Sequence, residues 1–129
     1  MRRVVLLGLL IGTGLAVSRA SSRGEQESSW TAFDGRDWRG FDPAEKRAYV
    51  AGFLASSALA EAGRAGVRSP AAVRRMIDSL SRGGGLRFPY SLAVYQTQLD
   101  EYYWWENHLP TRLYLALDEI NRRLAGHER

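Results

Sequence analysis

Carboxylates are the side chains of this sequence best suited to chemistry, because other catalytic residue types are scarce. The chain has no cysteine, two histidines and a single lysine, Lys46, which we expect to be solvated. None of its serines lies in a GxSxG nucleophile motif. The candidate acids are Asp34/Asp37, Asp100/Glu101, Asp118/Glu119 and Glu106. A glycoside hydrolase needs two carboxylates about 5–9 Å apart across a cleft, whereas adjacent residues on a helix point in different directions.

Glu106 is the weak candidate for a catalytic acid. Helical spacing puts it on the face of Tyr102 and Tyr103. Partial burial there would favour its protonated form, although carboxylates in such places more often pair with an arginine or cap a helix. We therefore expect no dedicated catalytic residue. With His108 and His127 as the only imidazoles, we also expect no metal and no cofactor.

Aromatic residues indicate an alternative to catalysis, namely the binding of a partner or ligand. Trp30, Trp38, Trp104 and Trp105 are the candidate binding residues. Trp104 and Trp105 follow two tyrosines, and four consecutive rings cannot share one helix face. We expect them to meet the aromatic stretch Trp30–Phe41 in one internal cluster. The alternative is an exposed indole patch, which would mark a binding surface.

Helices must position these residues, since no segment alternates as a strand does. Asp42, Pro43 and Glu45 predict the start of a helix that runs to Ala62. Further helices are predicted at 70–82, from 89–91 to 106, and at 110–124. The fold class is all-α, a small bundle of about four helices. The aromatic-rich N-terminal segment 30–41 is expected to cover the core; the alternative is a ligand-stacking platform.

A ridge of small residues follows the first of these helices. Ala48, Gly52, Ser56 and Ala60 recur every fourth position, which lets another backbone approach closely. We expect tight packing inside the domain, so that Gly52→Leu would destabilise it. The alternative is a seam between two copies of the chain.

The first twenty residues predict export. Arg2 and Arg3 precede a 14-residue apolar run, Val4–Val17. The small residues Ser18 and Ala20 follow, at the positions where a leader peptidase cleaves. This is the pattern of a signal peptide, and a membrane span needs about 20 apolar residues. We expect residues 1–20 to be a cleaved leader, 21–29 a flexible linker and 30–126 a single helical domain. The location would be periplasmic or secreted.

Removal of the leader changes the charge. The whole chain is formally +4, but the leader takes three of the 18 basic residues and none of the 14 acids. Fifteen basic residues then face fourteen acids, a net charge of +1. We expect no nucleic-acid partner and no stable membrane span in the mature chain.

Two segments resemble small exported bacterial helical proteins of unknown function. They are FDGRDWRGFDPAEKRAYVAGFLAS (33–56) and LDEYYWWENHLPTRLYLALDEINRRLAG (99–126). A looser similarity links the chain to Rap/Tai-type periplasmic immunity proteins, which carry cysteines near the start of their first helix, where this chain has none. The resemblance implies a helical envelope domain.

The sequence thus favours an uncharacterised protein-binding module of the cell envelope, with another envelope or secreted protein as partner. The alternative is a cell-wall-directed hydrolase or accessory enzyme that uses carboxylates.

Overall fold

The described part of the chain, residues 30–127 of a computed structural model, is all-α and contains no strand. Its elements are η1 (Trp30–Ala32), α1 (Gly35–Gly40), α2 (Pro43–Arg64), α3 (Pro70–Gly83), α4 (Leu92–Tyr102), η2 (Glu106–His108) and α5 (Leu113–His127). The predicted leader and linker, residues 1–29, lie outside the described residues. No helix between residues 30 and 127 is long and apolar enough to cross a membrane.

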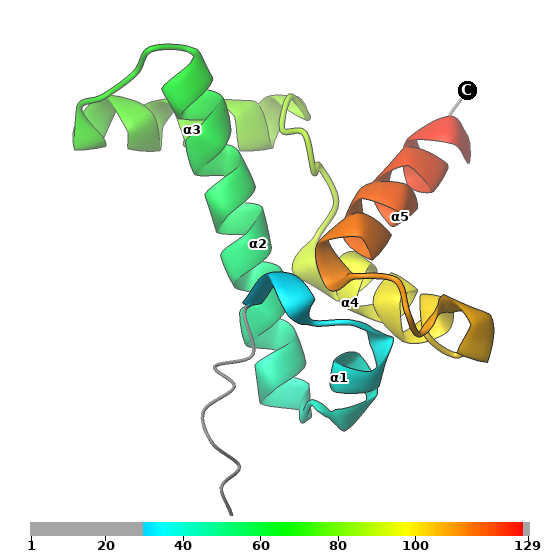
Figure 1. Cartoon of the computed structure of the whole chain (residues 1–129). Coiled ribbons are helices and arrows are strands. Elements are labelled where there is room, and N and C mark those ends of the chain that lie inside the picture. Colours follow the sequence, from blue (N-terminus) through cyan, green and yellow to red (C-terminus); the bar gives the residue numbers. More distant parts are fainter. Residues whose placement is uncertain (1–29, 128–129) are drawn as a thin grey trace, which may run out of the picture.

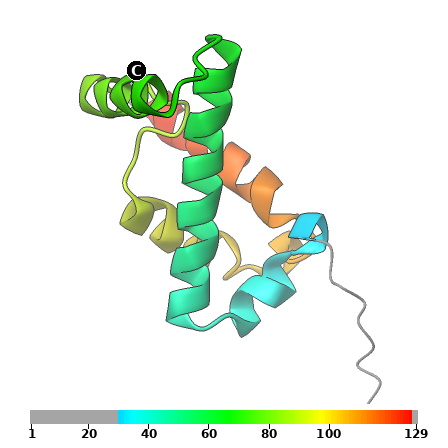
Figure 2. The same cartoon turned by 90° about the vertical axis from the view of Figure 1, so that its left-hand side faces the viewer.

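The long helix α2 organises the other helices. Figure 1 shows α1, α4 and α5 gathered around its first half, while α3 lies across its far end. Figure 2, turned by 90°, shows the same separation, with α1 at one end of α2 and α3 at the other. Helix α2 packs against α4 and α3, and α4 packs against α5. Within residues 30–127, the first half of α2 with α1, α4 and α5 forms the body, and the second half of α2 with α3 forms the arm.

Helix starts agree with the sequence analysis at Pro43 and Pro70. Asp42 accepts hydrogen bonds from the backbone N–H groups of Ala44 and Glu45, at 2.7 and 2.8 Å. The Glu45 carboxylate accepts one from the Asp42 N–H at 2.8 Å, which completes the predicted capping box.

Helix α1 is not among the helices predicted from the sequence. Asp34 caps this helix by accepting from the Arg36 N–H at 2.8 Å, and Asp37 accepts from the Asp34 N–H at 2.9 Å. The two carboxylates thus form a second capping box. They stabilise a helix start, and their pairing is no sign of a catalytic dyad.

Helix α4 ends earlier than predicted and α5 begins later. Helix α4 ends at Tyr102, and by Trp105 the backbone is extended. The start of α5 is fixed by the N-terminal segment, because the Leu113 N–H donates to the Phe33 carbonyl at 3.0 Å. Asp34 and Arg112 form an isolated bridge beside this bond.

The core lies between α1, α2, α4 and α5. Its fully buried side chains include one tryptophan, Trp38, and two tyrosines, Tyr95 and Tyr103. Phe33 and Phe41 pack half-buried against this core. No described side chain is both buried and without a hydrogen-bond partner for its polar atoms, so the interior satisfies its polar groups.

The prediction of a packed small-residue ridge is wrong. Ala48, Gly52, Ser56 and Ala60 are all exposed. A Cβ added at Gly52 would meet no atom within 4 Å. Helix α2 instead buries Val50, Ala58 and Ala62, positions that lie about 200° around the helix from the ridge.

The close backbone contact occurs at Gly35 instead. A Cβ at this position would lie 2.3 Å from Tyr103 Cδ1 and 2.9 Å from the Leu109 Cα. Neither atom can move easily, since Tyr103 is 1% exposed and the Gly35 N–H donates to the Leu109 carbonyl at 2.9 Å.

We predict that Gly35→Ala lowers the free energy of unfolding by about 1–3 kcal/mol, because it overpacks this contact. Gly52→Ala is the matched control. It should leave stability unchanged or raise it by about 0.5–1 kcal/mol, since alanine favours an open helix position. Urea denaturation of both variants measures the difference. Equal stabilities would contradict the assigned contact.

Candidate functional site

The indole tip, Trp104 and Trp105, is the most exposed aromatic feature of the described chain. Trp104 is 76% exposed and Trp105 62%. The two rings therefore do not join the internal cluster, and the expectation that they would is wrong. The alternative, an exposed indole patch, is the arrangement observed. Exposed aromatic patches of this kind often mark binding surfaces.

The tip projects because the two preceding tyrosines point inward. Tyr102 and Tyr103 are 6% and 1% exposed, and their rings pack edge to face. The Tyr103 hydroxyl donates to the Thr111 carbonyl at 2.8 Å, and burial raises the pKa of Tyr103. With two rings committed to the core, the next two side chains must leave it.

Arg39 of α1 holds the backbone of the tip from outside the α4–α5 turn. Its Nε donates to the Tyr103 carbonyl at 2.9 Å, and its Nη2 donates to the Trp104 carbonyl at 2.8 Å. One planar guanidinium thus binds two successive carbonyls. These carbonyls follow the last turn of α4, where helix carbonyls lack intrahelical partners.

His108 braces the other side of the turn. Its ring stacks on Tyr102 with centroids 4.2 Å apart, and its Nδ1 lies 2.7 Å from the Tyr102 carbonyl. Its backbone N–H donates to the Trp105 carbonyl at 3.1 Å. The indole rings are therefore carried on a turn that is held from both sides.

A shallow hollow of about 580 Å³ lies beside Trp104. Trp38, Arg39, Lys46, Asp100, Tyr103 and Trp104 line it. The Asp100 carboxylate accepts from Trp38 Nε1 at 2.9 Å and from Lys46 Nζ at 2.7 Å. Lys46 also lies 5.1 Å from the Trp38 ring centroid. The expectation of a solvated Lys46 is wrong, because this side chain is only 20% exposed.

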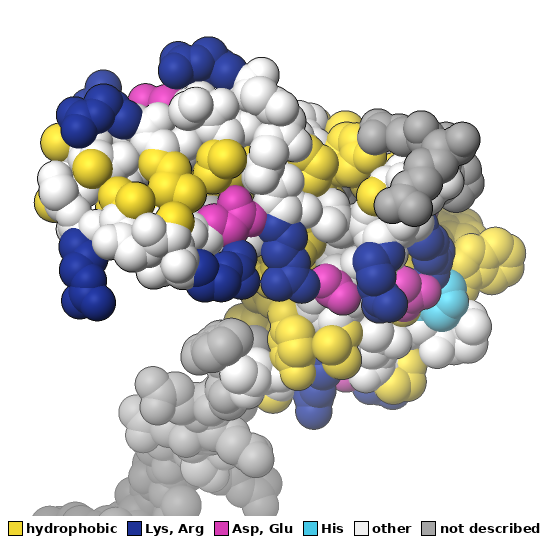
Figure 3. Space-filling view, turned by 90° about the horizontal axis from the view of Figure 1, so that it is seen from above, with side chains coloured by type: hydrophobic (Ala, Val, Ile, Leu, Met, Phe, Trp, Pro, Cys, Tyr) yellow, Lys and Arg dark blue, Asp and Glu magenta, His cyan; other side chains and the backbone are white. Residues whose placement is uncertain are grey.

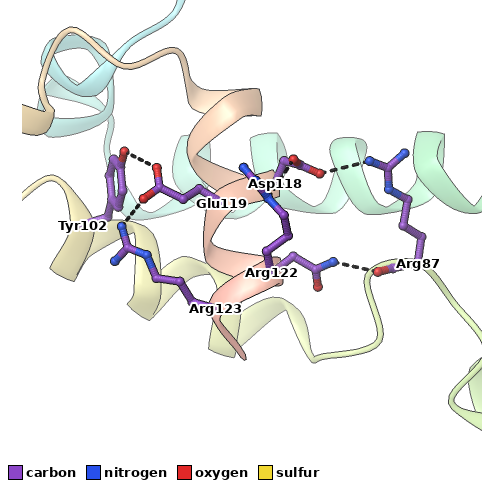
Figure 4. A network of polar contacts seen from close by, with 7 residues as sticks. Arg87, Tyr102, Asp118, Glu119, Arg122 and Arg123 are labelled. Atoms are coloured by element: carbon purple, nitrogen blue, oxygen red, sulfur yellow. Dashed lines mark hydrogen bonds and ion pairs between the residues drawn. The ribbon is translucent and has the colours of Figure 1, made fainter. Parts of the chain in front are cut away.

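A polar network on α5 fixes that helix against α4 (Figure 4). Glu119 accepts hydrogen bonds from the Tyr102 hydroxyl at 2.8 Å and from Arg123. Both bonds lower the pKa of Glu119, and the bond from Arg123 has the larger effect. The preceding residue, Asp118, pairs with Arg87 at 3.0 Å. Both carboxylates of this candidate pair therefore bind arginines and tie α5 to its neighbours.

The remaining candidate residues lie apart from the tip or away from solvent. Trp38 is fully buried, so its ring is not on the surface. Trp30 begins η1, and its side chain lies outside the described residues. Glu106 is exposed on η2, so the expectation of a partly buried carboxylate is wrong.

The small-residue ridge lines a second, larger groove between α2 and α5. This groove measures about 850 Å³, with Gly52 and Ser56 on one wall and Tyr114 and Leu115 on the other. Its alternative role as a seam between two copies of the chain stays a prediction.

Sequence reasoning missed Arg39, and it named Asp100 only as a candidate acid, without its contacts to Trp38 and Lys46. Arg39 contacts residues 64 and 65 positions away, and Asp100 contacts a residue 62 positions away. No local pattern in the sequence predicts contacts between residues so far apart. The capping box at Asp34 and Asp37 was the available signal, since it predicts the short helix that presents Arg39.

No family model, curated protein or solved structure matches the chain.

We predict that Arg39→Leu loosens the indole tip, since it removes both bonds to the carbonyls of Tyr103 and Trp104. Backbone NMR order parameters at Trp104 and Trp105 should fall from about 0.85 towards 0.6 or less. Arg36→Leu is the control, because Arg36 lies on the same helix and pairs with Asp34 rather than with the tip. If both variants leave the tip equally rigid, Arg39 does not hold it.

Proposed function

We propose that this chain is a small exported helical protein that acts by binding another envelope or secreted protein through the indole tip. The observation that carries the proposal is the exposure of two adjacent tryptophans on a braced turn. Tryptophan and arginine are the residues most enriched among the energetic anchors of protein interfaces.

The rigidity of the support favours binding over chance exposure. A loose surface indole would lose conformational freedom on association, which weakens binding. Here Arg39 and His108 hold the backbone on either side before any partner arrives. The hollow beside Trp104 adds a concave surface with two cations, Arg39 and Lys46, at its wall.

The compartment follows from residues 1–20, which we propose to be a cleaved leader that directs the protein to the periplasm or outside the cell. The similarity to small exported helical proteins supports the same location. The absence of cysteine means that packing alone, without disulfides, must hold the domain together in that compartment.

The aromatic N-terminal segment belongs to this proposal as a cover on a small helical bundle. Trp38 is fully buried, while Phe33 and Phe41 pack on the core with ring centroids 5.5 Å apart. In this role the segment seals the core and also supplies Arg39 to the tip. The alternative of a carboxylate-based hydrolase loses its main support, since Glu106 is exposed and five other candidate acids bind basic or backbone groups.

Photo-crosslinking in the cell tests the proposal. We predict that a benzophenone amino acid at position 104 gives one dominant protein adduct, which mass spectrometry identifies. The same probe at Leu115 is the control, because Leu115 is 50% exposed on another surface.

Trp104→Ala should abolish co-purification of that partner. The variant should also unfold at the wild-type denaturant concentration, since exposed substitutions change stability by only about 0.5 kcal/mol. No adduct at position 104, or equal adducts at both positions, would refute a binding role for the tip.

A further inference from the structure

Positive charge is concentrated in the arm formed by the end of α2, α3 and the flanking loops. Residues 61–87 contain six arginines and two acids, a net charge of +4. The rest of the described chain carries seven basic and nine acidic residues, a net charge of −2. The small overall charge therefore conceals two regions of opposite sign.

Most of these arginines are available to an external anion. Arg64, Arg68, Arg75 and Arg82 are exposed, and within residues 30–127 none of them pairs with a carboxylate. Arg74 meets Asp78 only at 4.0 Å, with its side chain 86% exposed. Such a pair is weak in water.

The arm also carries an incompletely covered apolar surface. No residue of α3 is buried, although Val73, Met76, Ile77 and Leu80 repeat at helical spacing and lie half-buried. A hollow of about 530 Å³ opens between α2 and α3. Its wall includes Val73, Ile77 and Leu59, which is 57% exposed, together with Arg68 and Arg74.

Figure 3 shows this combination from above the arm. Hydrophobic side chains run along the face formed by α2 and α3, and arginines lie around its edges. The arm stands away from the body, as Figure 1 shows. A flat surface can therefore approach it without meeting α4 or the indole tip.

We propose that this face of the arm docks on the surface of an anionic lipid bilayer. The arginines would bind lipid phosphates, and Leu59 with the neighbouring apolar side chains would enter the headgroup boundary. The positive charge of the arm favours an anionic surface as its partner. The apolar hollow favours a lipid bilayer over nucleic acid. A nucleic-acid site requires cations, hydrogen-bond donors and stacking rings, whereas the centre of this face is aliphatic. The docking is peripheral and is independent of the partner bound at the tip.

A single fluorescent label tests the proposal in the full chain. Because the sequence has no cysteine, Leu59→Cys takes an environment-sensitive dye at one position. We expect a blue shift with phosphatidylglycerol vesicles and none with phosphatidylcholine vesicles. Leu115→Cys is the matched control, because Leu115 is an exposed leucine on α5. A dye at this position should show no blue shift with either kind of vesicle. The local readout separates docking of the arm from any insertion of residues 4–17.

Charge variants in the Leu59→Cys background complete the test. Arg68→Gln with Arg74→Gln should raise the lipid concentration needed for half of the shift by roughly tenfold or more. Arg47→Gln with Arg122→Gln removes the same charge elsewhere and should change it much less.

Three results would overturn the proposal. The first is a dye at position 59 that stays in water. The second is an equal effect of the two charge variants. The third is a shift with duplex DNA that matches the shift with anionic vesicles, which would assign the face to nucleic acid.

Discussion

Burial of the Trp38 indole at the junction of three helices is the contact on which the body of the protein depends. The ring is fully buried, and its N–H donates to Asp100 of α4, which also binds Lys46 of α2. Loss of a buried aromatic ring costs about 3–5 kcal/mol, a large part of a total stability of about 5–15 kcal/mol. The Lys46–Asp100 pair is partly exposed and contributes about 0–1 kcal/mol. Burial of the ring therefore dominates, and the polar bonds fix its direction.

The packing around Trp38 also determines the position of the exposed indole tip. Helix α1 can present Arg39 to the end of α4 only if the adjacent Trp38 is seated, because the two side chains leave one short helix at neighbouring positions. Arg39 then holds the carbonyls of Tyr103 and Trp104. The inward packing of Tyr102 and Tyr103 leaves the next two indoles in solvent. A buried tryptophan and two exposed ones are thus parts of one arrangement.

Local signals in the sequence predicted the helices well and their contacts poorly. The Asp42–Glu45 capping box and the prolines at 43 and 70 located two helix starts, because caps act over three or four residues. The small-residue ridge failed as a packing signal, since small side chains suit both a tight contact and an open groove. Lys46 appeared solvated because its acidic partner lies 54 residues away. The net charge of the whole chain likewise gave no sign of the basic arm, because the excess of acids in the body offsets the excess of arginines in the arm.

Solvent exchange of the indole N–H groups, followed by NMR, distinguishes a buried Trp38 from exposed Trp104 and Trp105. Each indole proton has its own resonance, which substitution of single tryptophans by phenylalanine assigns. We expect the Trp38 proton to be protected by burial and by its bond to Asp100, while the Trp104 and Trp105 protons exchange rapidly. Rapid exchange at Trp38, or protection at Trp104 and Trp105, would contradict both the junction and the exposed binding surface.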